Sequence, residues 1–161
     1  MKNKSLILKI ITLTLSCLTF VSLFFPFVVV KTAMTNKQTI SFMDNLNLSG
    51  WQNYLKVENS KIWIWQLSNI LMIITLILIG LITVGTVLKF FIEKDILNKV
   101  CKYLSASVML LASAFIIFFI IGAFSQATIS SVFTTALFPH IGPMLLGIFA
   151  ILASVSSFKT E

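Results

Sequence analysis

The sequence predicts an all-α membrane protein, a four-transmembrane-helix bundle with a small extracellular β-hairpin in its first outer loop. Of the 161 residues, 58% are hydrophobic and only 11% are charged, whereas soluble domains carry roughly a quarter charged residues. The apolar residues fall into four blocks, each near the ~20 residues that a helix needs to cross a bilayer. A run of alternating residue types behind the first block predicts the hairpin.

The four blocks cover residues 10–30, 64–88, 103–124 and 141–158, and none contains Asp, Glu or Arg. Backbone groups inside the hydrocarbon layer have no water to bond, so each block is predicted to be an α-helix. The chain is therefore expected to form one integral membrane domain over residues 1–161. Outer loops are expected at about 31–63 and 125–140, and an inner loop at about 89–102.

The distribution of lysines predicts the orientation of the chain. Eight of the twelve lysines lie in the two terminal segments and the inner loop, and four lie in the first outer loop. Short loops rich in lysine stay in the cytoplasm, so we expect a cell-membrane protein with both termini cytoplasmic. Because these lysines flank helix ends, we interpret them as signals that set the membrane topology and as contacts for anionic lipid headgroups, and not as a nucleic-acid binding surface. Lysine-only, isoleucine-rich usage is associated with AT-rich bacterial genomes.

The stretch FFPFVVVKTAMTNKQTISFM carries the hairpin prediction. Pro26 is expected near the outer boundary of the membrane, where the backbone is no longer obliged to be helical. Beyond it, β-branched and apolar residues flank a short polar turn at Asn36 and Lys37, a pattern typical of a β-hairpin. Ile40 and Phe42 then face one side. An isolated hairpin is marginal in water, so it needs support from the bundle, the loop or a partner.

The segment that returns to the second block is rich in aromatic residues. It holds all three tryptophans within fifteen residues of the sequence. Such rings favour the headgroup level of a membrane, and they are also enriched at binding hot spots. We assign Trp63 and Trp65 to an interfacial belt. The candidate partner-binding residues are Trp51, Tyr54, Ile40 and Phe42.

The last block contains small residues at three- and four-residue spacing, which form a smooth stripe on one face of a helix. This stripe predicts close packing, either inside the bundle or at a homodimer seam. Gly80, Thr83 and Gly85 in the second block are candidates for the opposite surface. The candidate helix-packing residues are Gly147, Ala150, Ser154 and Ser157.

A search of the sequence for chemistry gives no catalytic, cofactor-binding or metal-binding candidates. The five acidic residues all fall outside the four blocks, and phosphate-binding glycine loops, hydrolase elbows and metal-ligand spacings are absent from it. We therefore expect a protein that is not an enzyme and needs no cofactor. Hydroxyls on the first block, at Thr12, Ser16 and Thr19, predict helix contacts, with a pore lining as the alternative.

The amino-terminal segment has a second interpretation. MKNKSLILKIITLTLSC has a basic start, an apolar run and a cysteine, as in a lipoprotein signal. The apolar run continues well past Cys17, and Thr14 stands where such signals usually carry leucine. These two features favour a membrane-spanning helix.

Three motifs carry a family resemblance: the FFPFV exit, the LSGW turn and the IGPMLLGIFAIL start of the last block. Together they resemble a loose group of small bacterial four-span membrane proteins of unknown function. The resemblance covers most of the chain and implies fold and membrane location. The topology is also similar to that of claudins, although this first outer loop lacks the two claudin cysteines.

From these features we expect a non-catalytic multi-pass membrane protein that acts as an interaction or accessory subunit through its outer loops. An immunity-type protein, which protects a cell against a membrane-active toxin, is one form of this role. The expected partners are the lipid bilayer and either another protein or a second copy of the chain, with no nucleic acid. The alternative is a small transporter or channel component.

Overall fold

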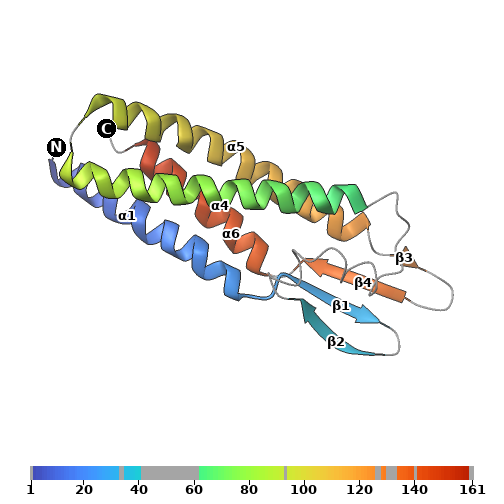
Figure 1. Ribbon diagram of the computed structural model, residues 1–161. Coiled ribbons are helices and arrows are strands. Elements are labelled where there is room, and N and C mark those ends of the chain that lie inside the picture. The colour runs from blue at the N-terminus through green and yellow to red at the C-terminus, as the bar shows by residue number, and fades with distance from the viewer. Residues whose placement is uncertain are drawn as a thin grey trace.

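The computed structural model describes residues 2–32, 35–40, 62–92, 94–125, 128–129, 134–139 and 141–159. Within these ranges, long helices form a bundle and short strands form a sheet at one end of it (Figure 1). The helices are α1 (Lys2–Val21), the short η1 (Ser22–Phe24), α4 (Ile62–Phe91), α5 (Asp95–Ser125) and α6 (Ile141–Phe158). The strands are β1 (Val28–Thr32), β2 (Thr35–Ile40), β3 (Thr128–Ile129) and β4 (Thr134–Pro139).

Four segments are long and apolar enough to cross a membrane. Their length and composition fit a multi-pass membrane protein, which confirms the prediction of four membrane-spanning helices at this level. The spans are Lys4–Phe24, Gln66–Phe91, Asp95–Gly122 and Ile141–Phe158.

The first helix ends earlier than the sequence predicted. The predicted block ran to residue 30, but α1 stops at Val21, η1 adds one turn, and β1 begins at Val28. Phe25 has extended backbone angles, φ −82° and ψ 151°, because a residue that precedes proline is disfavoured in the helical region. The β-branched run after Pro26 then favours a strand. Hydropathy alone does not separate a buried strand start from the end of an apolar helix.

The predicted inner loop at 89–102 is also wrong. Helix α4 continues to Phe91 and α5 begins at Asp95, so the connection between the two helices is short. Hydropathy detects only the part of a helix that faces lipid, whereas lysines can extend a helix beyond the hydrocarbon layer. An acidic residue in the first turn of α5 also favours the helix start there.

The four helices pack in a ring, in which α1 contacts α4 and α6, and α5 contacts the same two neighbours. The chain termini lie at one end of the bundle and the sheet lies at the other (Figure 1). Two layers of buried apolar side chains fill the interior. The first, near the sheet, consists of Phe27, Met72, Phe115, Phe119 and Leu146.

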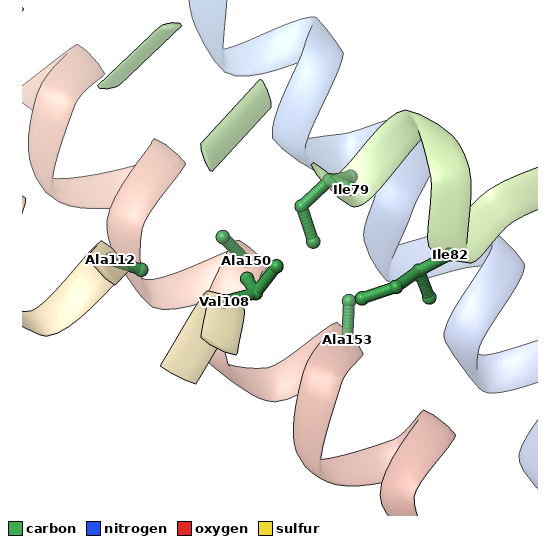
Figure 2. Close-up of a cluster of buried hydrophobic side chains, with 6 residues drawn as sticks. All are labelled: Ile79, Ile82, Val108, Ala112, Ala150 and Ala153. Atoms are coloured by element: carbon green, nitrogen blue, oxygen red, sulfur yellow. The ribbon is translucent and has the colours of Figure 1, made fainter. Parts of the chain in front are cut away.

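The second layer lies between α4, α5 and α6 and is built partly from alanines (Figure 2). Its members are Ile79, Ile82, Val108, Ala112, Ala150 and Ala153. In Figure 2 the two isoleucines of α4 lie beside the alanines of α6. Small side chains on α5 and α6 allow these helices to approach α4 closely, which is how helices gain packing energy where lipid removes the hydrophobic drive.

The strands form one antiparallel sheet in the order β2-β1-β4-β3. β1 pairs with β2 over the segment for which the sequence predicted a hairpin, with Val28 opposite Ile40. It also pairs with β4, with Val28 opposite Pro139. The second outer segment also belongs to this sheet, since its strand β4 lies beside β1. An all-α description is therefore incomplete for this chain, because both outer segments contribute strands.

Candidate functional site

The sheet is joined to the bundle where β1 leaves η1 and β4 enters α6. The backbone N–H of Gly142 donates a hydrogen bond to the carbonyl oxygen of Pro26 at 3.2 Å. A Cβ at Gly142 would lie 2.8 Å from that oxygen and 2.9 Å from the carbonyl oxygen of Phe25. These obstacles are backbone atoms that cannot swing aside, so the close approach requires glycine. We call the segments 25–27 and 141–142 the joint.

Phe27 anchors the joint to the rest of the bundle. Its side chain is fully buried in the layer that includes Met72 of α4, Phe115 of α5 and Leu146 of α6. Three residues earlier, Phe24 is 90% exposed. The first residue before β1 is therefore fixed by contacts with three helices, and the strand that follows begins from a fixed position.

The register places the centre of the sheet directly on this joint. Val28 lies opposite Ile40 on one side and Pro139 on the other. The last residue of β2 is thus beside the bundle, and the arrow of β2 points back toward it (Figure 1). Strand β2 therefore ends at Ile40, close to the joint.

Only part of the predicted partner-binding set falls within the described structure. Ile40 ends β2, whereas Phe42, Trp51 and Tyr54 lie outside the described residues. Trp63, which the sequence assigned to the interfacial belt, lies in the first turn of α4 and is 56% exposed.

All four predicted helix-packing residues are buried within one chain. A Cβ at Gly147 would lie 2.5 Å from two side-chain carbons of Ile116 on α5. Gly147 therefore packs against α5. The expectation that the stripe would face Gly80 and Gly85 of α4 is wrong at Gly147. Gly80 has open space around the position of a Cβ, and Gly85 lies against the sulfur of Cys101.

The buried hydroxyls of the bundle bond mainly to their own helices. Thr12 and Thr19 on α1 donate to the carbonyl oxygens of Leu8 and Leu15, each at 2.9 Å. The same bond to the carbonyl four residues earlier is made by Thr75, Thr83, Ser105 and Ser154. A hydroxyl that is occupied in this way satisfies its own proton inside an apolar bundle.

One hydroxyl pair links two helices. The side-chain oxygens of Thr12 on α1 and Ser156 on α6 are 3.0 Å apart, and the Ser156 hydroxyl lies 3.0 Å from the Leu8 carbonyl oxygen. Each hydroxyl has one proton to donate. When Thr12 donates to Ser156 instead of to Leu8, Ser156 donates to the Leu8 carbonyl in its place. Both side chains are buried, so this pair connects α1 to α6 away from water.

We expect Thr12→Val and Ser156→Ala each to lower the free energy of unfolding by about 1 kcal/mol, within the range of hydrogen bonds between membrane helices. The loss of unfolding free energy in the double variant should be about 0.6 kcal/mol smaller than the sum of the two single losses, because both changes remove the same bond. Unfolding by SDS measures this. Thr14→Val is the matched control, since Thr14 is exposed and bonds only its own helix. Strict additivity of the two losses would contradict the link.

Sequence reasoning missed the two residues that define the joint. Phe27 was visible only as part of FFPFV, and Gly142 only as one of several small residues in the last block. The signal in both cases was the position next to a proline at the boundary of an apolar block, since Phe27 follows Pro26 and Gly142 precedes Pro143. Their contact depends on bringing residues 26 and 142 together, which periodicity does not reveal.

In the described part of the chain, no group of three or more His, Cys, Asp or Glu residues could hold a metal ion. Comparisons with protein-family models, curated proteins and solved structures found no match. The resemblance to small bacterial four-span proteins, and the distant claudin-like topology, therefore stay predictions from the sequence.

Proposed function

We propose that this is a non-catalytic, multi-pass protein of the cell membrane that acts as an interaction or accessory subunit through its extracellular face. Under this proposal the sheet is a rigid support for the first outer segment, residues 41–61, which carries the binding residues. The joint carries the proposal, because the Gly142 bond to Pro26 and the buried Phe27 hold the sheet on the bundle. A support of this kind reduces the ordering cost of binding.

The orientation in this proposal is supported by where the lysines fall. The termini and the short connection between α4 and α5 lie at the end opposite the sheet (Figure 1). That end carries eight of the twelve lysines, which favours a cytoplasmic location for it. The sheet is then extracellular. Protection of the cell against a membrane-active toxin is one role that an extracellular binding face of this kind serves.

The test of this proposal is partner capture by crosslinking in native membranes. The double variant Trp51→Ala with Tyr54→Ala should reduce the captured partner about ten-fold or more, as expected for aromatic hot spots. Trp63→Ala is the matched control, since Trp63 is an exposed tryptophan of the α4 start and is assigned to the membrane boundary. Equal capture by the double variant and the unmodified chain would overturn the proposal.

The second candidate is a small transporter or channel component. One observation favours it: the buried hydroxyls of Ser16 and Ser68 make no hydrogen bond in the described part of the chain, and such groups call for a water or ligand partner. The backbone bonds of the other hydroxyls argue against a continuous polar path. Flux through liposomes that changes on Ser16→Ala would favour this candidate over the first.

A further inference from the structure

A buried lysine lies where α1 and α4 meet, at the end of the bundle that carries the termini. Lys89, in the last turn of α4, is only 6% exposed. The ammonium of Lys9 on α1 donates a hydrogen bond to the backbone carbonyl oxygen of Lys89 at 2.7 Å. It also lies over the ring of Phe90, 5.3 Å from the centroid. We call Lys9, Lys89 and Phe90 the lysine seam.

The carbonyl bond and the ring hold the Lys9 ammonium in place without using all of its protons. An ammonium has three N–H donors, and the carbonyl of Lys89 takes one. The remaining donors are available to an acceptor outside the bundle. A carbonyl at the last turn of a helix also carries the negative end of the helix dipole, which favours a cation there.

The lysine seam lacks an anion among the described residues. Asp95 is the one carboxylate in the described ranges, and it is exposed in the first turn of α5. Neither lysine of the seam forms an ion pair with it. Two ammonium groups that lie close together gain from an opposite charge beside them. By sequence, this end of the protein carries eight lysines against three acidic residues, so it attracts external anions.

Exposed apolar side chains flank the lysine seam on both helices. Ile10 on α1, and Val87, Leu88 and Phe90 on α4, are between 41% and 51% exposed. In a membrane these side chains face acyl chains. An anion that brings its own acyl chains therefore fits this position better than a free inorganic ion, because both of its parts find matching surfaces.

We propose that the lysine seam binds the headgroup phosphate of an anionic phospholipid in the leaflet on that side. Lys9, fixed by the Lys89 carbonyl and the Phe90 ring, donates to phosphate oxygens, and the Lys89 side chain adds a second positive charge. The acyl chains extend toward the middle of the bilayer along Ile10, Val87 and Leu88. This site is at the opposite end of the molecule from the extracellular binding face and does not depend on it.

The test uses the full chain in nanodiscs made from a mixture of phosphatidylcholine and phosphatidylglycerol, with the lipids that stay bound counted by native mass spectrometry. The unmodified chain should retain phosphatidylglycerol in preference to phosphatidylcholine. Lys9→Gln should reduce that preference about five-fold, the equivalent of one lysine contact near a membrane surface. Lys89→Gln should have a similar effect, and Lys9→Arg should keep the preference.

The matched control is Lys99→Gln, which removes the same charge from the same end of the bundle at an exposed position of α5. It should leave the preference close to that of the unmodified chain. Equal losses in Lys9→Gln and Lys99→Gln would mean diffuse attraction and would overturn the site. If Lys89→Gln fails to fold, the comparison of Lys9→Gln with Lys9→Arg decides.

A second arm separates lipid from free anion. Inorganic phosphate added at millimolar concentration should leave the bound phosphatidylglycerol unchanged. Displacement of the lipid by inorganic phosphate would show an anion site without lipid recognition and would overturn the assignment. Loss of partner capture in the Trp51 and Tyr54 variants has no bearing on this result, so the two proposals fail independently.

Discussion

Replacement of Gly142 with alanine should lower the free energy of unfolding by about 3 kcal/mol, the upper part of the usual range for overpacking. The new methyl group would meet the carbonyl oxygens of Pro26 and Phe25 at 2.8 and 2.9 Å. Relief of that contact moves the start of α6 away from the joint and stretches the hydrogen bond from Gly142 to Pro26. SDS-induced unfolding of the full chain measures the loss.

Gly80→Ala is the matched control for this prediction. Both glycines lie in apolar helices, but a Cβ at Gly80 meets no atom within 4 Å. Alanine is a better helix former than glycine by up to about 1 kcal/mol, so this variant should be unchanged or slightly more stable. A larger loss at Gly80 than at Gly142 would show that the joint is not the tight contact described above.

Phe27→Ala should cost about 3 kcal/mol, because removal of a fully buried phenylalanine leaves a cavity. The side chain packs with Met72 of α4, Phe115 of α5 and Leu146 of α6, so three helices lose contacts at once. The attachment of the sheet should weaken as well, which limited proteolysis of the outer segments reports independently of global unfolding. Faster cleavage without loss of the helical circular-dichroism signal is the expected pattern.

Phe24→Ala serves as the control, since it removes the same side chain three residues earlier at a position that is 90% exposed. It should change the free energy of unfolding by less than about 0.5 kcal/mol, as surface substitutions generally do. Phe27→Leu should recover much of the stability because it refills most of the volume. Similar losses in the Phe24 and Phe27 variants would contradict the anchoring role of Phe27.

The four helices could be predicted from the sequence because the physical cause is local. A bilayer requires a fixed length of apolar chain, and every block can be counted residue by residue. The helix ends were harder to predict from the sequence. Lys89 and Lys99 lie within helices, although charged residues at these positions are typical of a loop. Pro26 was placed near the outer boundary of the membrane, but the predicted helix ran on to residue 30, whereas the strand begins at Val28.

The sheet and the joint could be predicted only in part, because their causes are not local. The alternation in residues 28–40 indicates a hairpin. The pairing of Val28 with Pro139, however, joins positions that α4 and α5 separate in the sequence. The glycine at 142 and the isoleucine at 116 that faces Gly147 are likewise defined by partners distant in sequence. Residue type gives no register for such contacts. The binding residues Trp51 and Tyr54 stay a prediction.

The pairing of β1 with β4 has a consequence for biogenesis. The ribosome releases β1 after the first helix, yet its neighbour β4 emerges only after α4 and α5 have been made. Until then the start of β1 lacks both the β4 ladder and the Gly142 contact. Long-range pairing of this kind forms late. In a nascent chain the sheet therefore acquires its final arrangement only when the last helix is made. A chain truncated before β4 lacks that arrangement.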